Sequence, residues 1–225
     1  MHNADLQKRD MAAWRRLYQT PSADPIWHSL PFLSSIAEHF VSEGAYRILD
    51  AACGDGGQMV GFSDKQLFVG VDQSSRALAA ARRHLHARGR KNVVLCRSNL
   101  SRTPFPAGSF DGVLFIDTLS CFLEPTTVLR EFWRLLMPGG TLFLTTFSKS
   151  DPIANELEYL GTAVGLFGGK FINVLYSEGE LTELVESTGF EVTSISERRD
   201  NEAPHPVYRD KWHEHVRHIL TARRK

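Results

Sequence analysis

The spacing of apolar residues changes near residue 45. Before that point, residues 4–19 and 29–42 carry apolar side chains at helical spacing, and the helix-breaking sequence PSADP lies between them. After it, short apolar runs typical of strands alternate with helical patterns. Strands are predicted over 46–51, 67–71, 92–96, 110–116, 140–147, 190–196 and 215–222, and helices over 57–63, 74–89, 125–137 and 178–188.

This alternation predicts an α/β protein in which right-handed crossovers build a mostly parallel sheet covered on both faces. A chain of 225 residues suits one domain, 1–225. The helices of 1–45 are expected to form a cap at one edge of the sheet. The stretch 148–176 contains GTAVGLFGGKF and is interpreted as an inserted helix and flexible loop that serves as a lid.

Composition excludes several function classes. Lys plus Arg and Asp plus Glu each number 26, which provides no general field for nucleic acid or an anionic membrane. No apolar run approaches the length of a membrane span, and no signal peptide is present, so we expect a cytoplasmic protein. Three scattered cysteines without Cys/His ligand spacing predict reduced core thiols and no metal site.

A glycine-rich loop follows the first predicted strand, in ILDAACGDGGQ at 48–58. Gly54 and Gly56 would let a ligand approach the backbone, and a tight turn without a ligand is the alternative. The next strand ends in Asp72, eighteen positions after Gly54. A carboxylate there is placed to accept hydrogen bonds from both ribose hydroxyls, so a nucleoside site is predicted.

The loop departs from the dinucleotide fingerprint GxGxxG, because Met59 stands where the third glycine would be. Asp50 and Asp55 place negative charge beside the loop, which is unfavourable for a pyrophosphate. That charge suits a ligand that carries an ammonium and a sulfonium. S-adenosylmethionine therefore fits better than NAD, which remains the less favoured alternative.

Four motifs in order resemble the class I (Rossmann-like) S-adenosylmethionine-dependent methyltransferases, in particular the small-molecule branch. LDAACGDGG is similar to the first motif, hhDhGxGxG, and GVDQSS to the second. SNLSRTPFPAGSFDGVLFIDTL and LREFWRLLMPGGTLFLTTF resemble the later core motifs, so the resemblance covers roughly residues 46 to 196. It implies a three-layer sandwich with strand order 3-2-1-4-5-7-6, in which strand 7 is antiparallel.

The resemblance also implies a set of cofactor-binding residues. They are Asp50, Ala52, Gly54, Gly56, Asp72, Gln73, Asn99, Leu100, Ile116, Asp117 and Trp27. Two of them depart from the family's pattern: Ala52 stands where glycine is usual, and Asn99 stands where an acidic residue usually lies near the adenine. The motif (N/D)PPY is absent after the fourth strand, which argues against an exocyclic amine of a base or an amide as methyl acceptor.

The acceptor is expected to be a small, partly apolar molecule methylated on oxygen, with carbon, nitrogen and sulfur as alternatives. Positioning of the reactants can drive such an in-line transfer, so a general base is not required; His28 and His205 are the candidates for one. A non-catalytic module that binds S-adenosylmethionine or S-adenosylhomocysteine stays open as a second function. A monomer or homodimer is expected.

Overall fold

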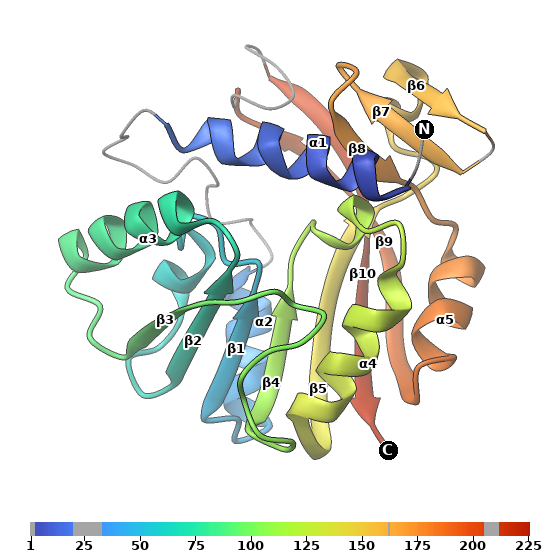
Figure 1. Ribbon diagram of the computed structural model, residues 1–225. Coiled ribbons are helices and arrows are strands. Elements are labelled where there is room, and N and C mark those ends of the chain that lie inside the picture. The colour runs from blue at the N-terminus through green and yellow to red at the C-terminus, as the bar shows by residue number, and fades with distance from the viewer. Residues whose placement is uncertain (1–2, 20–32, 162, 205–211) are drawn as a thin grey trace.

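A seven-stranded sheet forms the centre of the protein (Figure 1). The computed structural model describes residues 3–19, 33–161, 163–204 and 212–225. The strands, in chain order, are β1 (Arg47–Ala51), β2 (Leu67–Asp72), β3 (Val93–Arg97), β4 (Phe110–Phe115), β5 (Leu136–Phe147), β9 (Phe190–Glu202) and β10 (His213–Arg224). Their order across the sheet is β3-β2-β1-β4-β5-β10-β9.

Strands β1 to β5 pair in parallel, and β10 pairs antiparallel with both β5 and β9. The predicted order 3-2-1-4-5-7-6 is therefore confirmed once the inserted strands β6 to β8, which lie in a separate sheet, are left out of the count. The parallel strands all end at the same edge of the sheet. The loops after β1, β2 and β4 meet at that edge, where ligands bind in open α/β sheets.

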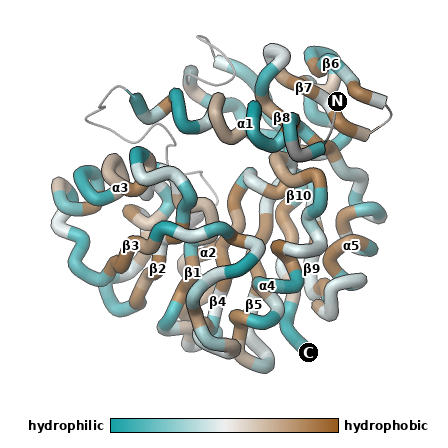
Figure 2. Tube along the Cα trace, viewed as in Figure 1, coloured by the Kyte–Doolittle hydropathy of each residue, from teal (hydrophilic) through white to brown (hydrophobic). Residues whose placement is uncertain are grey.

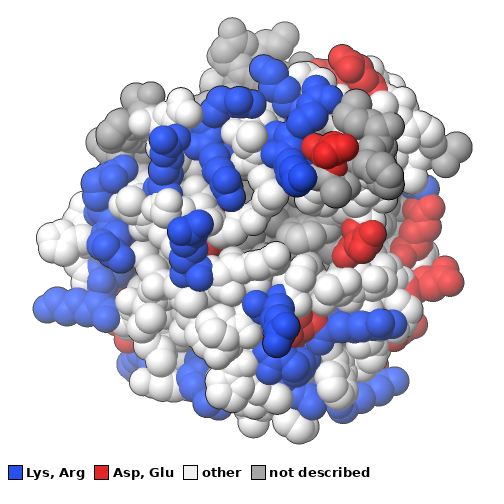
Figure 3. Space-filling model, in the orientation of Figure 1, with Lys and Arg blue, Asp and Glu red and all other residues white. Residues whose placement is uncertain are grey.

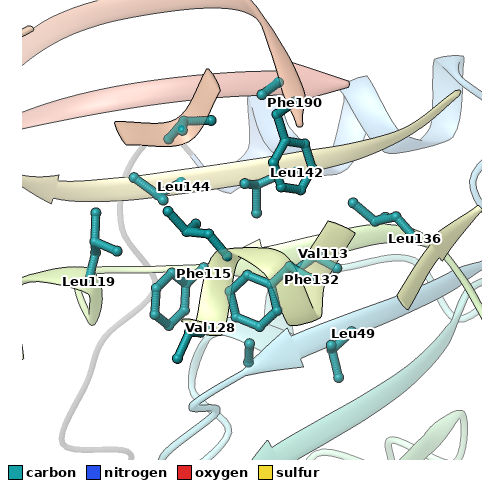
Figure 4. Close-up of a cluster of buried hydrophobic side chains, with 14 of the residues drawn as sticks. Leu49, Val113, Phe115, Leu119, Val128, Phe132, Leu136, Leu142, Leu144 and Phe190 are labelled. Carbon is teal, nitrogen blue, oxygen red and sulfur yellow. The ribbon is translucent and has the colours of Figure 1, made fainter. Parts of the chain in front are cut away.

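Helices cover both faces of the sheet. On one face α2 (Leu33–Ser42) and α3 (Ser75–Ala87) bury apolar side chains against β1, β2 and β4. On the other face α4 (Pro125–Leu135) and α5 (Glu178–Glu186) do the same. Figure 4 shows the second cluster, in which Phe132 of α4 lies beside Phe115 of β4. Figure 2 shows hydrophobic residues along the central strands, as a sheet buried on both faces requires.

The interpretation of 148–176 as a helix and flexible loop is wrong. After the 3-10 helix η3 (Pro152–Glu156), the segment forms an antiparallel sheet of β6 (Leu157–Leu160), β7 (Val164–Phe167) and β8 (Phe171–Val174). Gly168 and Gly169 both have positive φ and make the turn between β7 and β8. Short apolar runs do not distinguish a strand from a helix by spacing, which explains the error.

The expected helical cap over 1–45 is only partly correct. Helix α1 (Asn3–Leu17) does lie across the carboxyl-end edge, beside β8, as Figure 1 shows. Leu6 of α1 packs with Leu166 and Ile172 of the small sheet. Helix α2 instead covers a face of the main sheet, because Ile36 and Phe40 are buried in the core. Among the described residues, the cap therefore consists of α1 and the sheet of β6 to β8.

Candidate cofactor and acceptor site

A cavity of about 370 Å³ lies between the carboxyl-end edge of the sheet and α1. Its walls come from the loops after β1, β2 and β4, from α1, and from the ends of β9 and β10. A volume of this size is within the range of small-molecule sites, about 300–1,000 Å³. The loop positions follow from the parallel topology, whereas α1 and β10 reach the cavity from distant parts of the chain.

The glycine loop and Asp72 form one hydrogen-bonded unit. The backbone N–H of Gly54 donates to Asp72 Oδ2 at 3.1 Å, and that of Ser74 donates to Oδ1 at 2.7 Å. Burial raises the pKa of Asp72, although these N–H groups favour its charged form. Ala52 and Gly54 hold positive φ, so the loop curls at the end of β1 and its backbone faces the cavity.

The structure brings most of the sequence-predicted cofactor residues to one cavity. Eight of them line it: Ala52, Gly54, Asp72, Gln73, Asn99, Leu100, Ile116 and Asp117. They come from the segments after β1, β2, β3 and β4, so the edge of the sheet collects them. Trp27 and the candidate bases His28 and His205 lie outside the described residues.

Two predicted residues lie behind the cavity wall. Gly56 has φ of +80°, and a Cβ there would come within 3.2 Å of the Ala81 Cβ of α3, so its glycine serves the packing of that helix. Asp50 is 2% exposed and is not among the lining residues. Burial, followed by the negative charge of Asp72, raises the pKa of Asp50 to about 8. Asp50 therefore lies beneath the loop, and burial favours its protonated form at neutral pH.

Helix α1 contributes residues that the sequence interpretation missed. Asp10 lies in the cavity wall and is 2% exposed. Its Oδ1 accepts from the backbone N–H of Ile172 at 3.0 Å and from Trp14 Nε1 at 2.9 Å, which ties α1 to β8. Burial raises the pKa of Asp10 to about 7 against these hydrogen bonds. The sequence did contain a signal for this residue, because Asp10 is a charged residue on the face of the helix where the spacing predicts apolar side chains.

Strand β10 contributes a buried cation to the opposite wall. Arg217 Nε donates to Asp117 Oδ2 at 2.7 Å, and its Nη2 donates to Glu202. Burial lowers the pKa of Arg217, but the two carboxylates outweigh burial and raise it. Asp117 also accepts from Thr145 Oγ1 at 2.7 Å and holds a positive φ. These partners are far apart in the chain, so no local pattern indicates the network.

Comparison with known proteins agrees with this geometry. A family model described as a methyltransferase domain matches residues 49–144, from β1 through most of β5. Over this region the chain is similar to methyltransferase domains. The matched region contains the glycine loop, Asp72 and the segment after β4, which are parts that line the cavity.

Curated relatives of this chain are distant. An uncharacterized chloroplastic methyltransferase of Arabidopsis thaliana, At1g78140, is 28% identical over 63% of the chain and 42% of its own length. The ubiquinone biosynthesis O-methyltransferase of Dechloromonas aromatica is 28% identical over 72% of the chain and 68% of its own. The chain spans less than half of the length of the first two curated relatives, namely 42% and 35%.

Solved structures confirm the fold. The protein described for conversion of a disulfide bond into a thioacetal group in echinomycin biosynthesis has a TM-score of 0.75 at 16% identity, over 98% of this chain and 91% of its own. The 1,6-didemethyltoxoflavin N1-methyltransferase of Burkholderia thailandensis has a TM-score of 0.67 at 18% identity. This match covers 99% of this chain and 88% of that protein. Among the described residues, no helix is long and apolar enough to cross a membrane.

Proposed function

We propose that this protein transfers a methyl group from S-adenosylmethionine to an oxygen atom of a small, partly apolar molecule. One observation carries the proposal. A single cavity joins Asp72 and the glycine loop to a compartment roofed by Met11 and Trp14 of α1 and walled by Phe122 and Phe147. The first end has the groups that a nucleoside needs, and the second offers apolar surface to an acceptor.

The residues present fit the cofactor. Asp72 offers carboxylate oxygens at the cavity surface for two ribose hydroxyls. Asn99 and Leu100, after β3, lie where an adenine would follow the ribose. Asp72 brings negative charge to the cavity surface, and Asp50 adds to it only when ionised, which suits a cationic ligand. The same charges disfavour a pyrophosphate, which argues against NAD.

The bound cofactor supplies an electrophilic methyl group, and the chain's own residues arrange its transfer. The loop 52–57 and Asp72 hold one reactant against the sheet edge. Helix α1, tied to β8 through Asp10, covers the opposite side and excludes water from the apolar compartment. Positioning in a dry pocket of this kind supplies several kcal/mol of the barrier to an in-line displacement.

Oxygen is the proposed acceptor atom for two reasons. Relatives named O-methyltransferases occur in Penicillium expansum and Dechloromonas aromatica. The region after β4 reads IDTLSC and lacks the (N/D)PPY motif of exocyclic amine methylation. Relatives named sterol 24-C-methyltransferases make carbon the second candidate atom.

The remaining features of the proposal concern partners and location. We propose a cytoplasmic monomer or homodimer that acts on a small molecule and not on nucleic acid. The balanced total charge supports this, although the charge is unevenly distributed: Figure 3 shows mainly Lys and Arg over the face that carries α1 and α3. Any test for the methyl acceptor should therefore include an RNA fraction.

Calorimetry separates the cofactor from its alternatives. Titration of the protein with S-adenosylmethionine, S-adenosylhomocysteine and NAD should show binding of the first two only. Binding of NAD in place of S-adenosylmethionine would refute the proposal. Incubation with labelled cofactor and small-molecule extract then distinguishes an enzyme from a silent binding module. This second step is needed because the fold also occurs in the [4+2]-cyclase SpnF, which has a TM-score of 0.67 to this chain.

A further inference from the structure

Three potential metal ligands meet where β9 and β10 end beside the cavity. His213 and His215 are two positions apart on β10, so their side chains lie on the same face of the strand. The strand register places Glu202 of β9 directly opposite His213. One ligand atom from each of the three side chains lies within 4.8 Å of those of the other two.

We propose that Glu202, His213 and His215 form a binding site for a divalent transition-metal ion, with Zn²⁺ as the best-matched probe. Two imidazole nitrogens and one carboxylate are a donor set that catalytic zinc sites use, and the set leaves coordination positions open. Zinc bonds of about 2.0–2.2 Å require the ligand atoms to draw closer together than they lie here. Rotation of the Glu202 side chain, which is only partly buried, would achieve this.

A buried carboxylate supports His215 as a ligand. His215 Nδ1 lies 3.0 Å from Asp151 Oδ2, and the Asp151 side chain is fully buried. Asp151 itself is fixed by the backbone N–H groups of Ile153 and Val216, at 2.7 and 2.6 Å. This arrangement holds the imidazole with Nδ1 as donor and makes Nε2 its coordinating atom. Metal-bound histidines almost always have such a partner on their other nitrogen.

The charges around the cluster favour a dication. Asp151 bonds His215, whereas Asp117 and Glu202 both bond Arg217. Among the described residues these bonds bring together three carboxylates and one guanidinium. Arg217 bonds Glu202 through one carboxylate oxygen, Oε1, and a carboxylate can bridge an arginine and a metal through its two oxygens.

The position of the site gives it a chemical role. Glu202 and His215 both line the cavity, on the side of Arg217 and Asp117. A bound ion would present its open position to the acceptor compartment, where a hydroxyl or thiol could coordinate and lose its proton more readily. Sequence spacing predicted no metal site, because strand pairing and not a Cys/His motif brings these residues together.

Metal binding can be measured without a cofactor or an acceptor, so its outcome is independent of the proposed function. Untagged protein is treated with a chelator and titrated with Zn²⁺ by calorimetry and with Co²⁺ by visible absorption. We expect one ion per chain. His213→Gln, His215→Gln and Glu202→Gln should each weaken binding at least about tenfold, and Asp151→Asn about 10–100-fold. His86→Gln, at an exposed histidine of α3, is the matched control and should bind as the wild type does.

Substoichiometric binding by the wild type, or equal binding by the His213 and His215 variants, would overturn the proposal. Thermal melting shows whether each variant folds. If a variant does not fold, X-ray absorption of the wild-type Zn²⁺ complex decides: scattering from two imidazoles supports the site, and scattering from oxygen ligands with fewer imidazoles contradicts it.

Discussion

The backbone N–H of Gly54 donates a hydrogen bond to the Asp72 carboxylate at 3.1 Å. This bond joins the loop after β1 to the end of β2, the two segments from which a nucleoside site was predicted. It fixes the carboxylate in the cavity wall, and Ser74 N–H holds its other oxygen. Glycine is favoured at this point because Gly54 has a φ of +54°, in the left-handed region.

Replacement of Asp72 should weaken cofactor binding. Asp72→Ala removes the acceptor of the ribose hydroxyls and releases the Gly54 N–H, so we expect a loss of about 1–3 kcal/mol, or roughly 5- to 150-fold in Kd. Calorimetry with S-adenosylhomocysteine measures this. Asp64→Asn, at a side chain that is 79% exposed, is the control. Equal affinity of Asp72→Ala and wild type would place the ribose elsewhere.

Ala52 should be replaceable by glycine with a gain in stability. Its φ of +59° is in the left-handed region, which costs a residue with a Cβ about 1–2 kcal/mol. Ala52→Gly removes this cost but adds freedom to the unfolded chain, so a net gain of about 0.5–1 kcal/mol in the free energy of unfolding is expected. Urea denaturation tests this, and a lower midpoint for Ala52→Gly would be the contrary result.

Gly112 of β4 should not tolerate alanine. A Cβ there would lie 2.2 Å from Phe40 Cε1, so the ring that anchors α2 to the sheet must move. Overpacking of this kind costs about 1–3 kcal/mol. Gly179→Ala in α5 is the matched change, because its Cβ meets nothing within 4 Å and alanine favours a helix. Thermal melting should show Gly112→Ala below and Gly179→Ala at or above the wild type; equal melting would show that Phe40 adjusts freely.

Asp50 should make stability depend on pH. In the unfolded chain this carboxyl ionises near its ordinary pKa of 3.8, whereas burial and the charge of Asp72 hold the folded pKa at about 8. Between these values the folded chain binds more protons than the unfolded chain, so the free energy of unfolding falls as pH rises.

Asp50→Asn removes this titration with little change of shape. The loss of stability between pH 5 and pH 8 should therefore be smaller in Asp50→Asn than in the wild type, while the contribution from Asp10 cancels in the comparison. Urea unfolding at both pH values provides the measurement. Parallel stability curves for the two proteins would show that Asp50 is ionised in the folded chain.

The parts of the site that could be predicted from sequence are those that local pattern determines. The glycine loop and Asp72 follow parallel strands directly, so strand prediction places them at one edge. Arg217 contacts Asp117 across 100 positions of the chain, and the pairing of β10 with β5 that makes this possible leaves no mark near either residue.

The cap was harder to predict than the core. Residues 157–174 contain short apolar runs and several glycines, which are compatible with a loop, a helix or hairpins. Tertiary contacts such as the packing against Leu6 of α1 and the bond from Ile172 N–H to Asp10 help to select the strands that form. For the same reason, the acceptor compartment beneath α1 could not be outlined from sequence.

Transfer of labelled methyl from S-adenosylmethionine is the most direct test of the account. The wild type and Asp72→Ala are incubated with small-molecule extract, RNA and protein fractions, and the label is followed into each. We expect label in an organic-extractable product that contains a new methyl ether, with the rate reduced in Asp72→Ala at limiting cofactor. Label only in the RNA or protein fraction, or no transfer to any fraction by a protein that binds the cofactor, would contradict the account.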